Sequence, residues 1–440
     1  MRHIVCYMAF TMVSIQALSQ DNLQVQFAYR GTVAAARFLP STQILDGYKY
    51  EFGIQYSSWI ANSSITYGSL RKIYKHKQLT PEDVDGIIED LDTNNKIGGG
   101  QDFTVLTLGL NKNIKEHPVA WSFSIYDRMN LNLFIPKTLV QVAWQGNKQF
   151  EGQFMDHSNT RLVGLYFREF SLGAATTIIS WPNWILRGGF RFSYYQGLSG
   201  FQTTKSKIFS QTALGAEYID LDYDIEYRYT GIDDFNLFDT RGNGFGANLG
   251  VTFSYKEKLN FDLGITDLGS LKLKQDVAKV NSESDFRFYG LGLEELIDPT
   301  AFLDSLEEIF TPEIDTLGTN SFEMPIGTKL SIMVGWSFGK ITEKHGLNTL
   351  YLAYIQGFDE SPGVTQSPKF TLGIHKLVFR HLNLGLSASL GGFNDYAVGG
   401  LLGLQFKNVR FSLQSDDLTG FIAPNKTTGA GAGFILQLLF

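Results

Sequence analysis

Apolar and polar residues alternate one by one along much of this chain. Between residues 218 and 229 the apolar set is Ile219, Leu221, Tyr223, Ile225, Tyr227 and Tyr229, and the residues between them are Asp220, Asp222, Asp224, Glu226 and Arg228. The same alternation recurs at residues 382–391 and at Trp121, Phe123 and Ile125. Because successive side chains of a strand point to opposite faces, each segment predicts a β-strand with one apolar and one hydrated face.

Strand-like segments recur along the chain and predict an all-β protein, a transmembrane antiparallel β-barrel with about 14 strands. The alternative number is 16, because single-chain bacterial barrels favour even numbers. Residues 201–213 and 215–230 form a further hairpin, either in the wall or outside it, and residues 272–290 are ambiguous. The expected strands lie near residues 48–68, 101–113, 118–133, 158–179, 184–199, 243–256, 258–268, 324–338, 347–357, 367–378, 381–391, 394–406, 408–416 and 429–440.

Composition favours lipid as the solvent on the apolar face. Aromatic residues make up 14% of the chain and charged residues 18%, against about 25% charged in average globular proteins. After Ser19 no apolar run approaches the roughly 18 residues that a spanning helix needs, so a membrane protein of this sequence would cross as a closed barrel. A soluble β-sandwich or propeller is the alternative, because periodicity does not reveal the solvent. The net charge of −7 argues against nucleic acid as a partner.

The first residues resemble an export signal. A basic start at Arg2 precedes an apolar stretch from Ile4 to Ile15, and Ala17-Leu18-Ser19 offers small residues for cleavage. We therefore expect a signal peptide at 1–19 and a single barrel domain at 20–440, located in the cell outer membrane; a buried first helix is the alternative. Cys6 is the only cysteine and would be removed with the signal, which excludes disulfides and thiolate metal sites.

Connections between the expected strands alternate between short and long. Tight turns are predicted at 181–184, 256–258 and 407–408, and helical inserts near 80–92, 136–146 and 299–310. Thr80 is a suitable N-cap and Pro81 suits the first helical position. The apolar stripes of these helices could plug the lumen, contact a partner or rest on the barrel rim, and rim packing is favoured because amphipathic helices usually bury their stripe locally.

A series of short motifs resembles a known family when it is taken in order along the chain. The motifs are Asp127-Arg128, Pro136-Lys137, Trp144-Gln145-Gly146-Asn147, Tyr166-Phe167-Arg168-Glu169, Gln196-Gly197-Leu198, Thr203-Thr204-Lys205, Thr266-Asp267-Leu268-Gly269, Pro325 with Thr328-Lys329, and Asp417-Leu418-Thr419-Gly420-Phe421 with Pro424-Asn425. They resemble an uncharacterised family of outer-membrane barrels, a domain of unknown function common in Gram-negative bacteria that use type IX secretion.

The resemblance implies a barrel related to fatty-acid-transporter-like channels, and it implies no catalytic residue. The early Asn-Pro-Ala signature of the family reads Ala35-Ala36-Arg37 here, so a plug formed by the N-terminal segment is not carried over to this chain.

Candidate chemical sites are weak, and we assign no catalytic, cofactor-binding or metal-binding residue. Residues 90–94 resemble a calcium loop, but Asn95 and Gln101 stand where such a loop needs Gly and Glu, which favours a solvated turn. Asp220, Asp222, Asp224 and Glu226 could line a cation path, since their carboxylates would lie about 7 Å apart on one face, but a hydrated strand face explains them more simply. No cofactor is implied.

Metalloprotease and nucleotide-binding motifs are missing from the sequence. It contains no His-Glu-x-x-His pair and no phosphate-binding Gly-x-x-x-x-Gly-Lys-Ser/Thr sequence. His157 and Ser158 are adjacent in sequence, which does not make a nucleophile–base pair. Gly98-Gly99-Gly100 predicts a flexible loop before a strand, and Gly246, Gly250 and Gly264 predict curvature or close packing in the wall. We expect no enzyme activity.

The favoured function is therefore a channel or transporter for small or apolar solutes. A 14-strand barrel encloses a wider interior than the eight-strand case, where side chains fill the lumen. The alternative is a structural or scaffolding barrel of an envelope or secretion complex, which the helical inserts suit. Expected partners are outer-membrane lipid, the barrel-insertion machinery during assembly and other envelope proteins.

Overall fold

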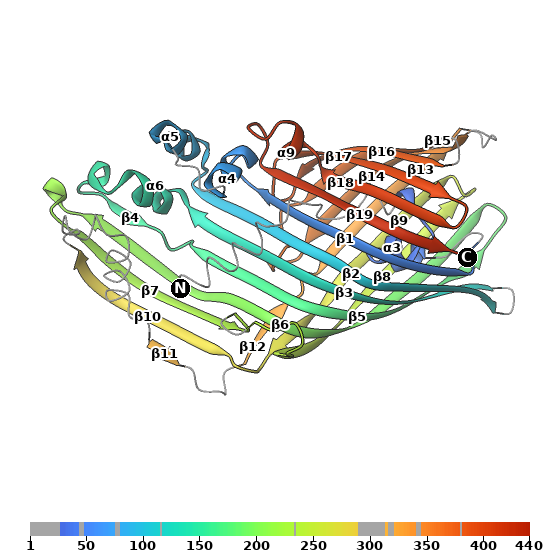
Figure 1. The fold of residues 1–440 in the computed structure, drawn as a ribbon, viewed down its shortest axis with the longest axis horizontal. Coiled ribbons are helices and arrows are strands. Elements are labelled where there is room, and N and C mark those ends of the chain that lie inside the picture. Colours follow the sequence, from blue (N-terminus) through green and yellow to red (C-terminus); the bar gives the residue numbers. More distant parts are fainter. Residues whose placement is uncertain are drawn as a thin grey trace.

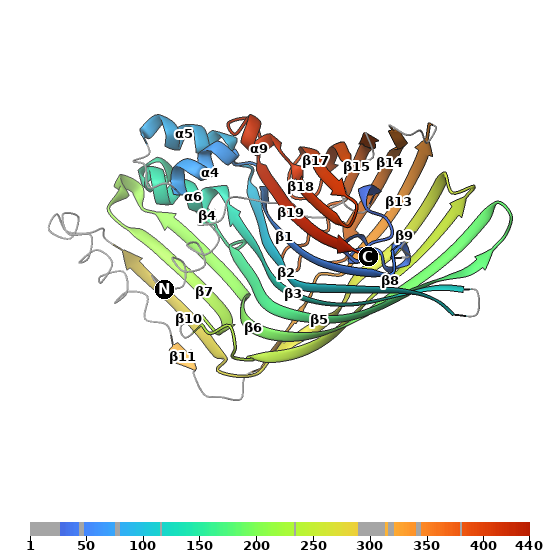
Figure 2. The same cartoon turned by 45° about the vertical axis from the view of Figure 1, so that its right-hand side comes forward.

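The computed structural model describes residues 27–43, 48–74, 80–114, 117–232, 235–288, 313–315, 321–339, 345–378 and 381–440. Within these ranges fourteen antiparallel strands close into a β-barrel, which confirms the predicted fold class and strand number. Figures 1 and 2 show these strands running obliquely around the barrel. The described helices are all too short or too polar to cross a membrane. The expected signal peptide and Cys6 lie outside the described residues.

The strands of the wall follow one another around the barrel in chain order. Each pairs antiparallel with the next, and β19 returns to β1, where Glu51 lies opposite Leu439 and Ala61 opposite Gly429. This closing pair satisfies the backbone groups that an open edge would expose to lipid. The wall strands are β1 (Tyr50–Asn62), β2 (Asn94–Ile114), β3 (His117–Pro136), β5 (Arg161–Ser180), β6 (Trp184–Thr212), β8 (Gly242–Tyr255), β9 (Leu259–Leu273), β13 (Lys329–Phe338), β14 (His345–Gly357), β15 (Lys369–Val378), β16 (Leu382–Gly391), β17 (Tyr396–Phe406), β18 (Val409–Asp417) and β19 (Gly429–Leu439).

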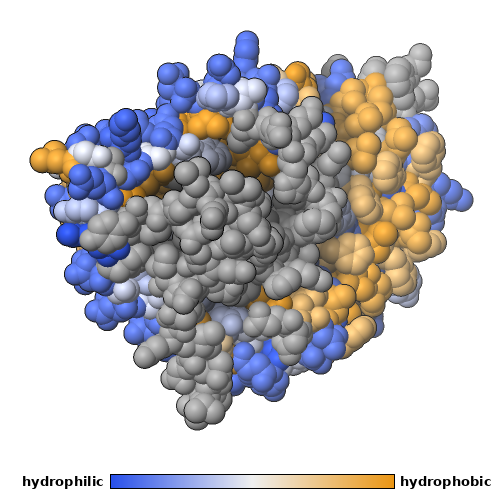
Figure 3. All heavy atoms as spheres, turned by 60° about the vertical axis from the view of Figure 1, so that its left-hand side comes forward, coloured by the Kyte–Doolittle hydropathy of each residue, from blue (hydrophilic) through white to orange (hydrophobic). Residues whose placement is uncertain are grey.

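The outward and inward faces of the wall differ in polarity. In β15, Phe370, Leu372 and Ile374 point outward and are 43–54% exposed, whereas Thr371 and His375 at alternate positions are buried inside. Figure 3 shows apolar side chains gathered on the right of the view and mostly polar side chains along its left side. An apolar outer band around a closed barrel is the surface that outer-membrane barrels present to lipid.

The two ends of the barrel have connections of different length. At one end, here called the turn end, Trp181 and Trp184 exchange backbone hydrogen bonds in a tight turn, as predicted. Lys256 and Glu257 at the same end have positive φ angles of 48° and 55°, the conformation of a type I′ hairpin turn. The other end, the loop end, carries the longer connections and the helices (Figure 2), which is typical of the extracellular side of such barrels.

Part of the same sheet, here called the extension, continues the wall beyond the loop end (Figure 1). The first part of β6 pairs with β8 in the wall, and its last part, residues 200–212, pairs with β7 outside it. The hairpin predicted at 201–230 therefore projects from the barrel. The other strands of the extension are β4 (Phe154–Asp156), β7 (Ile219–Thr230), β10 (Ala278–Phe288) and β11 (Glu313–Asp315).

The most regular alternation in the sequence lies in β7 and not in the barrel wall. The inference that its apolar face touches lipid is wrong, because β7 is hydrogen-bonded between β6 and β10 in the extension. Tyr223 on that face is 4% exposed, and Tyr227 stacks on Phe201 with ring centroids 5.3 Å apart. Alternation shows that the two faces of a strand differ, but it does not identify what covers each face.

Short helices lie in the connections at the loop end. In α5, the Thr80 hydroxyl accepts a hydrogen bond from the Asp83 N–H, and the Asp83 carboxylate accepts one from the Thr80 N–H. Ile87 and Leu91 of this segment pack with Ile65 in a small apolar cluster on the rim. Residues 299–310, where a third insert was predicted, lie outside the described residues. The helices here are α4 (Tyr67–Tyr74), α5 (Pro81–Asp90), α6 (Lys137–Gln145), η2 (Lys148–Phe150), η3 (Leu214–Ala216) and α9 (Thr419–Ile422).

Candidate functional site: the barrel lumen

Residues 27–43, here called the plug segment, lie inside the barrel. The segment contains α3 (Val33–Ala36) and the one-turn helix η1 (Pro40–Thr42). Phe27 stacks on Tyr351 of β14 with ring centroids 4.1 Å apart, and the Tyr29 hydroxyl hydrogen-bonds to Ser412 of β18. On another side of the lumen, Gln43 accepts a hydrogen bond from Ser122 of β3 at 3.0 Å. The segment therefore reaches wall strands on several sides of the lumen.

The altered signature at residues 35–37 does not remove the plug, so the expectation drawn from it is corrected. Ala35 and Ala36 are fully buried in α3, where small side chains allow the helix to fit within the lumen. Arg37 is 5% exposed and pairs with Asp102 of β2 at 2.9 Å. The three residues that depart from the family signature thus hold the segment inside.

Both halves of the plug segment are tied to one polar group on the wall. Arg30 donates two hydrogen bonds to the Asp262 carboxylate of β9, at 2.6 and 2.8 Å. Thr252 of β8 also donates to Asp262, at 2.8 Å, and its hydroxyl lies 2.8 Å from that of Ser41. Because an arginine–carboxylate pair with two parallel bonds fixes orientation as well as distance, this group positions the segment precisely.

A buried carboxylate of the wall holds the middle of the plug segment. Glu51 of β1 is fully buried and accepts a hydrogen bond of 2.8 Å from the backbone N–H of Val33. Its other oxygen accepts one of 2.8 Å from Gln437 of β19. The contact is a polar bond between the wall and the plug backbone at the start of α3.

Glycines in the wall make room for the plug segment. A Cβ atom on Gly189 of β6 would lie 2.4 Å from the carbonyl carbon of Pro40, and one on Gly264 would lie 2.8 Å from Leu39. Gly250 is similarly close to Leu39 and to Pro40. The close packing that the sequence predicted for Gly250 and Gly264 is confirmed, and the packing partner is the plug.

Arg128 of β3 lies at the centre of an ion-pair cluster on the loop side of the plug. Its guanidinium binds the Asp267 carboxylate with two bonds of 2.8 and 2.9 Å. It also lies 3.0 Å from Glu169 of β5 and 3.4 Å from Asp102 of β2. Arg128 is 6% exposed, so this charge is largely removed from water and depends on its three carboxylate partners.

A β-bulge directs Asp267 into the lumen. Thr266 and Asp267 of β9 together lie opposite the single residue Asn248 of β8, and Asp267 has a positive φ of 56°. A bulge bends the strand and changes the direction of a side chain. Since β5, β6 and β8 separate β3 from β9 in the wall, the Arg128–Asp267 pair spans the lumen rather than two neighbouring strands.

The plug segment and the Arg128 cluster share residues. Asp102 pairs with Arg37 of the plug and with Arg128 of the wall. Asn248 donates a hydrogen bond of 3.0 Å to the Arg37 carbonyl oxygen and accepts one of 2.8 Å from the Asp267 N–H. Displacing the plug therefore breaks the Arg37–Asp102 ion pair and the hydrogen bond from Asn248 to the Arg37 carbonyl oxygen.

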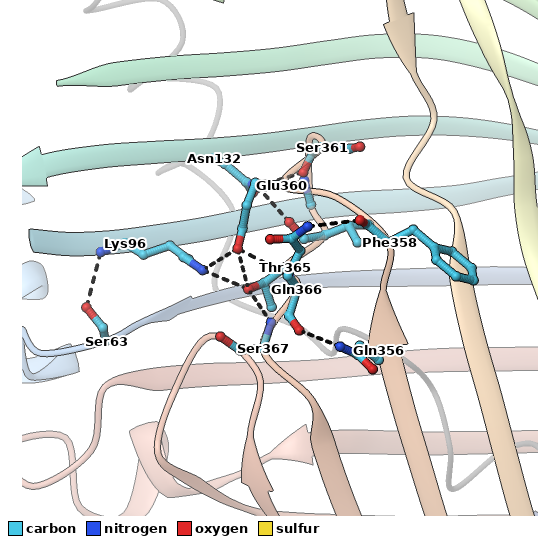
Figure 4. Close-up of polar contacts among 12 residues, drawn as sticks. Ser63, Lys96, Asn132, Gln356, Phe358, Glu360, Ser361, Thr365, Gln366 and Ser367 are labelled. Atoms are coloured by element: carbon cyan, nitrogen blue, oxygen red, sulfur yellow. Dashed lines mark hydrogen bonds and ion pairs between the residues drawn. The ribbon is translucent and has the colours of Figure 1, made fainter. Parts of the chain in front are cut away.

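The connection between β14 and β15, residues 358–368, folds inward and is here called the inner loop. The side-chain amide of Asn132 on β3 donates to the carbonyl oxygens of Ser361 and Val364, at 2.6 and 2.9 Å, and its oxygen accepts from the Gly363 N–H at 3.0 Å. Figure 4 shows this contact between the loop and strands of the far wall. Lys96 of β2 lies nearby and binds the Glu360 carboxylate at 2.7 Å.

An apolar cluster fills the interior beside the Arg128 cluster toward the loop end. It contains residues of β5, β6 and β9 and of the short strand β12 (Phe322–Pro325), which pairs with the end of β9. The plug, the ion-pair cluster, the apolar cluster and the inner loop thus all lie within the lumen. The members of the apolar cluster are Val163, Leu165, Phe167, Tyr195, Leu271, Leu273, Val277, Phe322, Met324 and Ile326.

The acidic ladder of the sequence does not line the lumen, because β7 lies in the extension. Asp220 accepts two hydrogen bonds from Arg287 of β10, at 2.7 and 3.0 Å, which lowers the pKa of the Asp220 carboxyl. Glu226 lies 2.9 Å from Lys279, whose hydrogen bond lowers the pKa of that carboxyl as well. A cation path through the barrel along these residues is therefore ruled out by their position.

His157 joins the extension to α6. Its Nδ1 lies 2.8 Å from the Thr138 hydroxyl and its Nε2 lies 2.9 Å from the Ser210 hydroxyl. Burial lowers the pKa of His157, although the neighbouring Asp156 acts in the opposite direction. The adjacent Ser158 hydroxyl accepts from the Ile208 N–H and is not a partner of His157. His157 and Ser158 therefore bond to different partners and do not form a nucleophile–base pair.

The structure corrects the sequence-based interpretation of one other segment and refines that of a second. Gly98-Gly99-Gly100 lies inside β2 and not in a loop, and a Cβ on Gly98 would lie 2.4 Å from the Phe393 ring. In the loop that resembles a calcium site, the Asn95 side chain bonds to the backbone of Asp92 and of Ile135. That one side chain binds both the N–H and the carbonyl oxygen of Asp92 and so closes the turn.

Sequence reasoning missed the ion-pair cluster as a functional site. Several of its members lie in motifs that carried the family resemblance, but nothing in their spacing indicated that they meet. A usable signal existed: Asp102, Arg128 and Glu169 are charged residues at inward positions of strands, where burial demands a partner. The inner loop gave no such signal, since Asn132 is an ordinary polar residue on the hydrated face.

Similar structures include the crystal structure of the Ralstonia pickettii toluene transporter TbuX, at 9% identity and TM-score 0.44, covering 98% of this chain and 96% of that one. The Pseudomonas putida toluene transporter TodX shows 8% identity and TM-score 0.40 over 97% and 98%. A Pseudomonas aeruginosa FadL homologue shows 12% identity and TM-score 0.37 over 97% and 98%. These TM-scores are below 0.5, so the fold rests on the strand pairing itself.

A comparison with curated proteins finds no match for this sequence. A family model, by contrast, matches residues 44–416, which is most of the chain and nearly all of the barrel. The model carries the description "Family of unknown function (DUF5723)". The chain belongs to this family of unknown function, DUF5723.

Proposed function

We propose that the protein is an outer-membrane channel for small solutes, closed by the plug segment and opened when that segment moves. The observation that carries the proposal is the nature of the contacts between plug and wall. Arg30, Val33 and Arg37 are held by the carboxylates of Asp262, Glu51 and Asp102. Phe27 and Leu39 add apolar contacts with the wall. Water can replace the polar contacts at modest cost, so the segment can leave without unravelling the wall.

The polarity of the inner wall supports a conduit over a solid structural body. Burying ion pairs is expensive, and well-packed apolar residues of similar volume often stabilise a protein as well or better. The lumen nevertheless holds buried charges at Glu51, Arg128, Glu169 and Asp262. These side chains suit a surface that becomes hydrated once the plug is displaced.

The apolar cluster toward the loop end favours solutes with apolar parts. Phe167, Leu271 and Met324 are at most 1% exposed and form a packed, uncharged layer in the lumen. A solute that crosses this layer must separate these side chains, and it recovers apolar contact if it is itself apolar. Small or apolar solutes therefore remain the favoured class.

A scaffolding role is the second candidate, and the extension favours it. Phe154, Leu214 and Phe238 at this end are 64%, 80% and 81% exposed. Exposed large apolar side chains outside the lipid-facing band are a feature of protein–protein contacts. Envelope partners, the insertion machinery and a type IX secretion context stay predictions, and we assign no catalytic role.

Neighbouring glycines of β6 provide a matched test of the channel. A Cβ on Gly189 would lie 2.4–2.6 Å from backbone atoms of Pro40 and Ser41, whereas one on the outward Gly188 would meet only the end of the Ile178 side chain, at 2.7 Å. Gly189→Ala should therefore push the plug from the wall and raise single-channel conductance or open probability in planar bilayers. Gly188→Ala should match the unsubstituted protein. Equal conductance in both variants would count against the proposal.

A further inference from the structure

A cleft of 460 Å³ opens at the loop end beside the inner loop. This volume lies within the range of about 300–1,000 Å³ that is typical of small-molecule sites. Its walls come from the loop-end termini of β2, β3 and β5, from residues 203–206 of β6 and from residues 158–159. Lys96, Arg161 and Lys205 line the cleft, and the lining residues include no carboxylate. The cleft is therefore a cationic hollow in a chain of net negative charge.

The three cations of the cleft differ in their partners. Lys96 binds Glu360 of the inner loop, and Lys205 pairs with Asp224 of β7. Arg161 stacks over the Phe134 ring, with its guanidinium carbon 4.2 Å from the ring centroid. Within the described part of the chain, no carboxylate pairs with Arg161. Its five N–H donors are therefore available to a ligand that approaches through the cleft.

Hydroxyl and amide groups of the lining add further donors. The Ser206 hydroxyl is buried and has no hydrogen-bond partner within the described residues. The Ser158 and Thr203 hydroxyls accept bonds from the backbone N–H groups of Ile208 and Leu162, so each keeps its own proton for donation. The cleft thus combines a free guanidinium with several neutral donors and lacks acidic acceptors among its lining residues.

We propose that this cleft binds an acidic saccharide. The carboxylate of a uronic acid accepts two parallel bonds from a guanidinium, which is the strongest recognition that Arg161 can offer. The several hydroxyl oxygens of a sugar can accept bonds from Ser206, Ser158 and Thr203, whereas a simple inorganic anion carries its oxygens around a single atom. A neutral sugar satisfies the hydroxyl groups but leaves the guanidinium without a counter-charge.

The ligand also competes with a contact that holds the inner loop. Figure 4 shows Lys96 bound to Glu360 and Thr365 of that loop. A sugar carboxylate within reach of Lys96 replaces the Glu360 carboxylate as its partner, which loosens one attachment of the loop. This consequence rests on the proposed channel function, whereas binding in the cleft does not.

Calorimetric titration of the full chain in detergent with tri-galacturonic acid tests the proposal. We expect saturable binding that weakens with added salt, and a loss of affinity of about tenfold or more in Arg161→Gln. Ser206→Ala should bind more weakly than the unsubstituted protein. Arg71→Gln, which changes an exposed arginine of α4 outside the cleft, should bind normally.

Neutral galactotriose and sodium sulfate complete the experiment. Neither should compete with tri-galacturonate at equal concentration. Competition by sulfate alone would show a general anion site, and equal binding by Arg161→Gln would place the sugar elsewhere; either result overturns the proposal. Because binding is measured without conductance, its failure leaves the Gly189→Ala test of the channel untouched.

Discussion

Arg128 and Asp267 form a two-bond ion pair across the lumen, with N–O distances of 2.8 and 2.9 Å, although 139 positions separate them in the chain. The pair connects β3 to β9 past three intervening wall strands. Asn248 binds the Asp267 N–H and the carbonyl oxygen of Arg37 in the plug segment. The barrel wall and its plug are therefore held by one connected set of polar contacts.

Replacing Arg128 with Met should destabilise the barrel strongly. The substitution leaves the buried carboxylates of Asp267 and Glu169 without their cation, and removal of one partner of a buried pair costs about 3–5 kcal/mol. The free energy of unfolding, measured by tryptophan fluorescence in urea with the protein in phospholipid vesicles, should fall by that order.

Arg71→Met is the matched control for Arg128→Met, because Arg71 is exposed on α4. It should change the free energy of unfolding by less than about 0.5 kcal/mol, as surface substitutions usually do. An Arg128→Met protein as stable as this control would show that the pair is not needed to hold the lumen.

Replacing Asn132 with Ala should release the inner loop. Its amide makes three hydrogen bonds to backbone groups of residues 361, 363 and 364, and the truncation leaves these groups without partners. Hydrogen exchange of residues 358–368, followed by mass spectrometry, should become faster while exchange in β14 and β15 stays slow. Asn147→Ala, at a partly exposed position after α6 and outside the inner loop, should leave the inner loop protected. Unchanged exchange in Asn132→Ala would contradict the assigned contact.

The contact of His157 with Thr138 and Ser210 should weaken in acid. Burial keeps the pKa of His157 below its ordinary value of 6.5 in the folded protein, so the neutral form is favoured there. The stabilisation is fully present above about pH 6.5 and declines as the pH falls toward the lowered value, because the unfolded segment takes up the proton first. Hydrogen exchange of residues 154–160 should therefore accelerate between pH 7 and pH 5.

A His157→Gln variant should lose most of this pH dependence, since Gln does not titrate. His117→Gln, which changes an exposed histidine at the turn end, should keep it. If both variants follow the unsubstituted protein, another group controls the acid response of this segment.

The barrel itself could be predicted from the sequence, because lipid and lumen impose opposite polarities on alternate residues. The outward Phe370, Leu372 and Ile374 are the clearest example, and the wall strands lie where the alternation placed them. The resemblance to a family of unknown function is confirmed by the match over residues 44–416. The same rule did not decide the position of β7, which the sequence left either in the wall or outside it and whose apolar face packs within the extension.

The lumen could not be predicted, because its contacts join residues far apart in the chain. A loop was the natural reading of Gly98-Gly99-Gly100, but these residues stay in β2 and leave room for Phe393. The departure from the family signature at Ala35-Ala36-Arg37 suggested that a plug was lost, whereas Arg37 finds its carboxylate on β2. Strand periodicity carries no information on which inward residues meet across a barrel.

The most direct measurement is the single-channel conductance of the full chain against a variant lacking residues 27–43, both reconstituted in planar bilayers. We predict that the unsubstituted protein is closed for most of the recording and that the deletion variant conducts steadily. A folded deletion variant, verified by its heat-modifiable migration on gels, that conducts no more than the unsubstituted protein would contradict the account.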